Sequence, residues 1–368
     1  MNKHNTKYVG IDLGDQTMLV HVRDETGEFV EETRLPTTAL ALAGEFGQQA
    51  PMRIALEAGG HSRWVSQVLS RYGHEVIVAD ARKLRLIYEN RRKSDRVDAE
   101  YLAKLVRLDP SLLSPVKHRG EEAQQDLAIL RSRDRLVQAR TQLVNHARGM
   151  VKSFGGRLPH CSTDSFARKG KTALPERVRP ALQPILESIQ DLSVRIRKYE
   201  RDIERLCEQR YPETARLRQI KGVGALTALA YVLTLEDAQR FQQSREVGPY
   251  LGLVPRRNQS GESDPQGHIT KTGDHYLRRL LVGSAHYILG PFGEECRLRT
   301  WGLRLAERGG KTAKKRAVIA VARKLAILLH KLWVSGETYH PLYPAKPAEG
   351  LTEEWPASNT FYNNPPKA

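Results

Sequence analysis

The sequence predicts an α/β domain over about the first 108 residues, followed by mainly helical regions. Apolar runs at 7–12 and 17–22 flank the turn Gly14-Asp15, and a third run, at about 28–34, follows Thr26-Gly27. Closely spaced apolar runs with turn residues between them are typical of a three-strand meander. Beyond the meander the pattern predicts, in chain order, a helix, a strand, a helix, a strand and a helix at 38–48, 52–57, 61–72, 74–79 and 95–108. The order βββαβαβα is that of a ribonuclease-H-like mixed sheet.

From about residue 121 the apolar spacing becomes helical. Residues Leu130, Val137, Val144 and Val151 recur every seven positions. After a stretch with Gly and Pro at 155–184, a second helix carries apolar residues in alternating steps of three and four, namely Leu182, Ile185, Ile189, Leu192, Ile196, Tyr199, Ile203 and Leu206. Such a narrow seam needs a partner helix. The partner is either the 121–153 helix, in an intramolecular hairpin, or a second copy, in a dimerising coiled coil, and the two are compatible.

The charge of the chain indicates a polyanionic partner. Its 368 residues carry a formal net charge of +17, and residues 251–330 hold 15 Lys+Arg against 6 Asp+Glu, so we expect the polyanion to dock there. No run of 18 apolar residues occurs, and the N-terminus lacks the apolar segment of a signal peptide. Cys161, Cys207 and Cys296 are too far apart for a disulfide framework or a zinc cluster. We therefore expect an intracellular, cytoplasmic protein that binds nucleic acid and has no membrane partner.

Four acidic residues occupy places that favour metal-dependent chemistry. Asp12 ends the first strand and Glu57 ends the fourth, and these strands are parallel neighbours in a ribonuclease-H-like sheet. Asp95 and Asp98 are three residues apart on a helix and so face the same way. Carboxylates that meet at one rim need a counter-charge, which two Mg²⁺ ions would supply for phosphodiester chemistry. Taken singly, each is a solvated or capping residue, and Asp95 is a candidate N-cap of its helix.

Further along the chain, three features point to phosphate. Gly222 and Gly224 interrupt two short helical patterns, as in a helix-hairpin-helix, although a plain turn has the same signature. Ser260 lies in a polar loop after Arg256 and Arg257, where it is either a turn serine or a nucleophile. Two further helices are predicted at about 276–289 and 313–333. Basic residues on these helices favour phosphate contacts or a solvated face, and they are Lys271, Arg278, Arg279, Lys314 and Lys315.

Three stretches together resemble the DEDD-type insertion-sequence transposases, which include the Piv DNA invertases and the bridge-RNA-guided recombinases. They are GIDLG with LEAGG; NRRKSDRVDAEYLAKLVRLDPSLLSPV; and IKGVGALTALA with GLVPRRNQSGESDPQGHITKTGDHYLRRLL. The similarity covers roughly residues 7–333. Asp15 departs from the usual pattern of the family by adding an acid beside Asp12.

The resemblance implies a division into domains: a RuvC-like nuclease domain at 1–120, a coiled-coil region at 121–212 and a helical transposase domain at 213–340. Residues 341–368, rich in Pro and Asn, are expected to form a disordered tail. It also implies that Asp12, Glu57, Asp95 and Asp98 bind two Mg²⁺, and that Ser260 forms a covalent phosphoserine link to DNA. In the family the two parts of each site come from different subunits of a dimer or tetramer, and a non-coding RNA chooses donor and target DNA. The resemblance therefore also implies that the protein associates with the bacterial nucleoid in the cytoplasm.

Three hypotheses for function therefore stand. The first is an RNA-guided DNA transposase or recombinase that uses the four acids and Ser260. The second is a metal-dependent junction endonuclease that uses the same acids with water. The third is a non-catalytic nucleic-acid-binding scaffold. Substitution of the acids separates the scaffold from both enzymes, and substitution of Ser260 separates the two enzymes.

Overall fold

The computed structural model describes residues 6–81, 83, 94–257, 259–261, 263, 265–307 and 309–342. These residues fall into two compact units, residues 1–118 and residues 119 onward. Among the described residues, no helix combines the length and the apolar character needed to cross a membrane. The predicted tail lies almost entirely outside the described residues.

The first unit is built on a five-stranded mixed sheet in the order β3-β2-β1-β4-β5. Its strands are β1 (Tyr8–Leu13), β2 (Thr17–Arg23), β3 (Phe29–Pro36), β4 (Arg53–Glu57) and β5 (Glu75–Ala79). The first three form the predicted antiparallel meander, and β4 and β5 add in parallel to the β1 side. The predicted mixed α/β sheet and its element order are confirmed, and the strand order is consistent with a RuvC-like domain.

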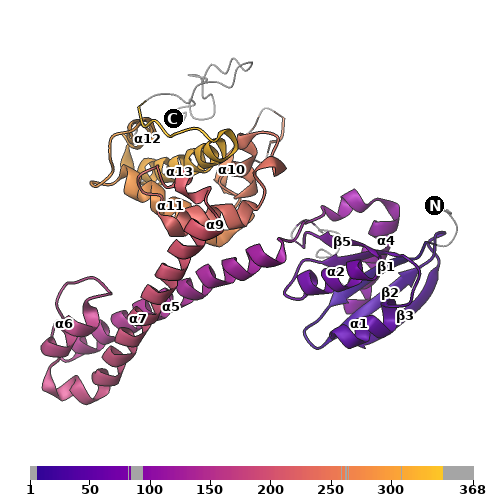
Figure 1. The fold of residues 1–368 in the computed structure, drawn as a ribbon, viewed down its shortest axis with the longest axis horizontal. Helices are drawn as coiled ribbons and strands as arrows, with labels where there is room; N and C mark the ends of the chain where they lie inside the picture. Colours follow the sequence, from indigo (N-terminus) through magenta and orange to yellow (C-terminus); the bar gives the residue numbers. More distant parts are fainter. Residues whose placement is uncertain are drawn as a thin grey trace. The chain divides into compact units, whose positions relative to one another are not determined.

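Helices cover both faces of this sheet (Figure 1). On one face α1 (Ala39–Phe46) and α2 (Ser62–Arg71) bury apolar residues against alternate positions of β1 and β4, such as Ile11 and Ile54. On the other face α4 (Asp95–Leu108) packs with Ala55 and Ala79. The single-turn helix η1 (Pro110–Leu113) adds Leu113 to that second layer. Because successive strand residues point to opposite faces, the two layers assign each strand side chain to one face.

Two long helices, α5 (Glu121–Ser153) and α7 (Arg179–Gln209), pack against each other in the second unit. Alternate positions of the predicted seam are fully buried, namely Leu182, Ile189, Ile196 and Ile203. The other half of the seam is only half-buried, namely Ile185, Leu192, Tyr199 and Leu206. The intramolecular pairing is therefore present, whereas a coiled coil between subunits stays a prediction.

A helix interrupts the stretch that separates these two helices. The connection at 155–184 contains α6 (Phe166–Ala173), which the sequence analysis missed. Gly170 lowers its helix propensity, and the helix is held instead by packing, because Phe166 and Ala167 are buried in the core that α5 and α7 share. The following helix α7 begins at Arg179, with Pro180 in its first turn, where a missing N–H has no cost.

The remaining helices surround one core that also includes the ends of α5 and α7 nearest to them. They are α8 (Thr214–Leu217), α9 (Ala225–Leu235), α10 (Val247–Tyr250), α11 (His275–Leu289), α12 (Arg297–Ala306) and α13 (Gly310–Ser335), with the short turns η2 (Glu176–Val178), η3 (Ala238–Arg240) and η4 (Ser244–Glu246) elsewhere in the unit. The predicted helices at about 276–289 and 313–333 are confirmed. Helix α12 and a two-stranded sheet of β6 (Pro255–Arg257) and β7 (Gln266–Ile269) were not predicted from the sequence.

Candidate active site

The ends of β1 and β4 place Asp12 and Glu57 side by side in the sheet. The two strands are parallel, and their register pairs Ile11 with Leu56, so the next residue on each strand is the acid. Asp12 lies two positions after Gly10, and Glu57 lies two positions after Ala55. Ala55 packs on the α4 side, and α4 approaches Gly10 so closely that a Cβ there would overlap the carbonyl oxygen of Ala99. Both carboxylates therefore project from the face that α4 covers.

The N-terminus of α4 lies at the same rim of the sheet. A carboxylate oxygen of Asp95 is 3.3 Å from the guanidinium of Arg34. In the sheet, Arg34 of β3 lies opposite Leu19 of β2, and Leu19 lies opposite Asp12 of β1. Glu100, further along the helix, pairs at 2.9 Å with Arg23, at the opposite end of β2. The helix thus runs antiparallel to β1, and Asp95 and Asp98 come to the rim at which Asp12 and Glu57 end. We call these four residues the acidic rim.

The two acids of α4 differ in their surroundings. Asp98 is 6% exposed, whereas the Asp95 side chain is 61% exposed and paired with Arg34. Asp95 is not the N-cap, because the Ser94 hydroxyl accepts the hydrogen bond from the backbone N–H of Val97. Both acids lie in the first turn, where negative charge stabilises the helix dipole. Asp98 is consequently the most buried of the four acids, and burial of a charged carboxylate is costly unless other groups compensate its charge.

The donor set of the acidic rim fits a hard divalent cation, since all four side chains offer carboxylate oxygens. Among the described residues, however, no three His, Cys, Asp or Glu side chains lie close enough together to hold a metal ion. The structure therefore brings the four acids to one edge and one face of the sheet without closing them into a metal cluster.

Next to the acidic rim, the turn after β4 carries a histidine that the sequence analysis did not single out. His61 Nε2 lies 3.3 Å from a carboxylate oxygen of Asp15, and His61 Nδ1 accepts a hydrogen bond from the indole of Trp64 at 3.0 Å. This pattern places the proton of neutral His61 on Nε2, facing Asp15. Asp15 thus pairs with His61. His61 could have been singled out from the sequence, because it follows closely after Glu57, the acid that ends β4.

Ser260 lies in the second unit, at the tip of the hairpin formed by β6 and β7. Its backbone N–H donates to Ser263 O and its carbonyl accepts from Ser263 N–H, both at 3.0 Å. Ser260 is exposed, and Gly261 turns the chain with a φ of +56°. Arg256 and Arg257, on β6, are exposed as well. We call residues 252–273 the serine arm.

The base of the serine arm is tightly built. Gly252 has a φ of +66°, and a Cβ there would overlap the backbone of Thr272. The guanidinium of Arg278 donates to Leu251 O at 2.9 Å and to Thr272 O at 2.6 Å, so one side chain ties both ends of the arm. Arg278 is 7% exposed, which places it under the arm rather than on the expected solvent-facing side of the helix. Lys271 precedes α11, with a φ of +56°, and is not part of the helix as predicted.

The glycines Gly222 and Gly224 border an open groove of about 550 Å³ between α9 and α11. Gly222 has a φ of +95°, and Gly224 is the N-cap of α9, where no side chain caps the first N–H groups of the helix. Basic side chains line the groove, namely Arg133, Arg218, Lys221 and Arg279. Arg279 is balanced by Asp134 at 2.6 Å. The preceding helix α8 is a single turn, so a helix-hairpin-helix stays a prediction.

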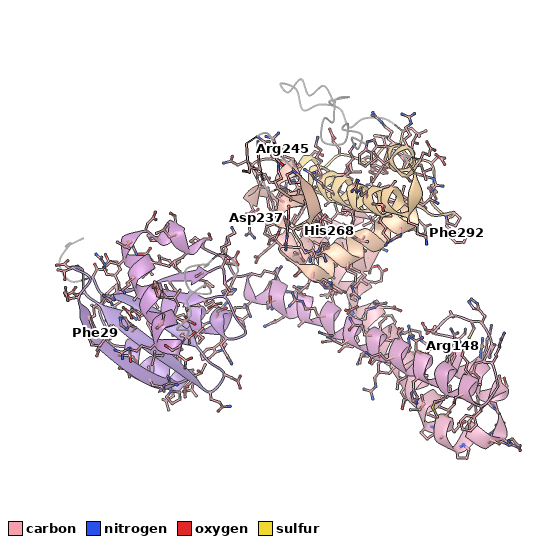
Figure 2. All side chains as sticks on the ribbon, turned by 180° about the vertical axis from the view of Figure 1, so that it is seen from behind. Phe29, Arg148, Asp237, Arg245, His268 and Phe292 are labelled. Atoms are coloured by element: carbon pink, nitrogen blue, oxygen red, sulfur yellow. The ribbon has the colours of Figure 1, made fainter. Side chains whose placement is uncertain are left out.

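Lys314 and Lys315 are exposed near the start of α13. Neither forms an ion pair with an acidic group in the part of the chain that the structure describes. Figure 2 shows His268 of β7, which belongs to the serine arm, and Arg245, both in the unit that begins at residue 119. The acidic rim belongs to residues 1–118 and Ser260 to residues 119 onward, so the predicted site residues are divided between two compact units.

Comparison with known proteins gives two matching families. A model of transposases of the IS110 DEDD type matches residues 9–155, which include the whole acidic rim. A model of the transposase IS116/IS110/IS902 family matches residues 214–293, which include Gly222, Gly224 and the serine arm.

Relatives align with most of the chain. A probable family 20 transposase of Pseudomonas aeruginosa is 28% identical over 92% of this chain and 99% of its own length. A putative transposase of Sinorhizobium fredii is 30% identical over 80% of this chain and 76% of its own length. A pilin gene-inverting protein of Moraxella lacunata is 34% identical over 30% of this chain and 33% of its own length.

Proposed function

Because the chain belongs to the IS116/IS110/IS902 family of insertion-sequence transposases, and is thus a DNA-processing enzyme, we propose that it exchanges DNA strands through a covalent intermediate on Ser260. The observation that carries the proposal is the placement of four acids at one rim and of an exposed serine on an arm with a fixed base. The proposal includes a homo-oligomer, donor and target DNA, and a non-coding RNA that selects both.

Asp12, Glu57, Asp95 and Asp98 would hold the metal, with Asp98 as the buried anchor. Mg²⁺ bound there would polarise a scissile phosphate and stabilise the charge that develops on it. The exposed position of Ser260 suits attack on a phosphorus, and Arg256 and Arg257 on the neighbouring strand suit stabilisation of the phosphate oxygens.

The covalent step is a balanced exchange of esters. The Ser260 hydroxyl gives up its proton, its oxygen bonds to phosphorus, and the bond from phosphorus to one deoxyribose oxygen breaks. That deoxyribose oxygen takes a proton and leaves as a hydroxyl. In the second step a hydroxyl of the partner strand attacks the phosphoserine, a new DNA phosphodiester forms, and the serine hydroxyl is regenerated.

The oligomer is supported by the half-buried column of α7. Ile185, Leu192, Tyr199 and Leu206 recur every seven residues and are only partly covered by α5 and its neighbours. A seven-residue apolar spacing on two paired helices suits a second pair of the same kind. An oligomer would also let the acidic rim of one subunit meet the serine arm of another.

The test uses purified protein, guide RNA, Mg²⁺ and labelled donor and target DNA on denaturing gels. The wild type should form a protein–DNA adduct, and Ser260→Ala should form neither adduct nor exchanged strands while still binding DNA. Ser263→Ala is the matched control, because Ser263 pairs with Ser260 across the tip of the arm, and it should keep the adduct. If Ser260→Ala cuts DNA at the wild-type rate and neither protein forms an adduct, water is the nucleophile and the chain acts as a junction endonuclease.

A further inference from the structure

The far end of the α5–α7 pair carries a concentration of positive charge. Residues 146–182, which we call the hairpin head, hold eight Lys+Arg against two Asp+Glu. They comprise the end of α5, the whole of α6 and the start of α7. The charge pattern of the sequence predicted polyanion binding at 251–330, outside the hairpin head. Because the net charge of the whole chain is +17, the hairpin head holds about a third of it.

The packing of the hairpin head directs these cations outward. Phe166 and Ala167 of α6 are buried, and Gly170 lets α6 approach Leu186 of α7, because a Cβ there would lie 3.2 Å from that side chain. The inner face of α6 is thus fixed in an apolar core. Its remaining positions, including Arg168, Lys169 and Lys171, are exposed to solvent. The charged face follows from the buried one, since a helix that buries one stripe exposes the other.

The acids of the hairpin head do not neutralise this face. Asp164 pairs with Arg140 and with Arg197, each at 3.3 Å, so its charge is taken up by the shaft of the two helices. Six exposed cations of the head form no ion pair with any acidic group of the described residues, namely Lys152, Arg157, Arg168, Lys169, Lys171 and Arg177. An exposed aromatic ring, Phe154 at 58%, lies among them in the sequence. Cations without internal partners are available to an external polyanion.

The position of the hairpin head separates it from the other basic surfaces of its unit. Leu130 of α5 is buried in the core of the C-terminal helices, and Val151 is buried in the core of the head. At 1.5 Å per helical residue these two positions are roughly 30 Å apart. Figures 1 and 2 show α6 and Arg148 at the end of the pair away from α9 to α13. A polyanion held at the head is therefore contacted well away from the serine arm.

We propose that the hairpin head binds the phosphate backbone of double-stranded DNA at a distance from the strands that are exchanged. Duplex DNA is the polyanion that the family membership supplies, and exposed Lys and Arg without base-reading partners suit backbone contacts. The inference goes beyond the proposed function, since it needs neither Ser260 nor a guide RNA.

The experiment measures binding of the full chain to a labelled duplex of arbitrary sequence over a series of salt concentrations. The variant Arg168→Gln, Lys169→Gln, Lys171→Gln removes three exposed charges of α6. If each contacts a phosphate, the slope of log K against log [salt] should decrease in magnitude by roughly 2.7. A charge-keeping variant, Arg168→Lys, Lys169→Arg, Lys171→Arg, should bind as the wild type does, and it separates loss of charge from loss of folding.

A matched control removes three exposed cations from the shaft of α7 by Arg195→Gln, Lys198→Gln and Arg201→Gln. Its slope should change much less. The proposal is overturned if the α6 variant keeps the wild-type slope, or if the shaft variant loses as much. It is also overturned if the α6 variant loses binding to a structured RNA hairpin but not to duplex DNA. Because binding is measured without strand exchange, a failure to form the Ser260 adduct would leave this result unaffected.

Discussion

The acidic rim and the serine arm present their functional groups in opposite ways. The rim is set on the ends of β1 and β4, with α4 packed against Gly10, and Asp98 is almost completely buried. The arm carries Ser260 at the tip between two strands of three and four residues, and every described residue of that tip is exposed. The rim is held along its length by a sheet and a helix, while the arm is held at its base by Arg278 and Gly252. This difference suits the roles proposed for the two sites. Four carboxylates that bind a metal ion together need a rigid support, whereas a serine that attacks a phosphate needs to be exposed.

The largest expected effect separates two acids of the same region. Asp98→Asn should reduce strand exchange at least roughly a thousandfold, which corresponds to ~4 kcal/mol of transition-state stabilisation. Asp15→Asn is the matched control, since Asp15 pairs with His61 and is exposed, and it should keep most of the activity. Rates of product formation with a fixed DNA pair check both. If both variants lose strand-exchange activity equally, Asp98 has no greater role than Asp15, and the assignment of the acidic rim is wrong.

Strand exchange should depend on the base of the serine arm as well as on Ser260. Gly252→Ala forces a side chain into a left-handed conformation and against the backbone of Thr272, which shifts the tip. A displacement of about 1 Å costs roughly 10²-fold in rate, so exchange should fall by that order while duplex binding is retained. Gly267→Ala should be nearly silent, because among the described residues the new methyl group would meet only the Cβ and the carbonyl oxygen of Arg256, each at 3.5 Å. If both variants are equally active, the base does not position Ser260.

The same contrast explains what could be predicted. Helix 95–108 was predicted with its observed bounds, because its apolar spacing is a local signal, although its N-cap is Ser94 and not Asp95 as the sequence suggested. Asp12 and Glu57 followed from the ends of regular strands. The arm was missed because strands as short as Pro255–Arg257 carry no alternating pattern. Arg278 was expected among phosphate contacts, since a sequence does not show which face of α11 the arm covers. The helix α6 was not predicted because Gly170 lowers its helix propensity, whereas in the structure a Cβ at this position would be in tight contact with Leu186.

The most direct measurement of the central claim is to map the DNA attachment by mass spectrometry of protease-digested wild-type protein after reaction with donor DNA and Mg²⁺. The account predicts a nucleotide remnant on Ser260 and none on Ser263, and no remnant on either serine in Asp98→Asn. A remnant on another residue, or an adduct at the wild-type level in Asp98→Asn, would contradict the claim that the acidic rim and Ser260 act on the same phosphate.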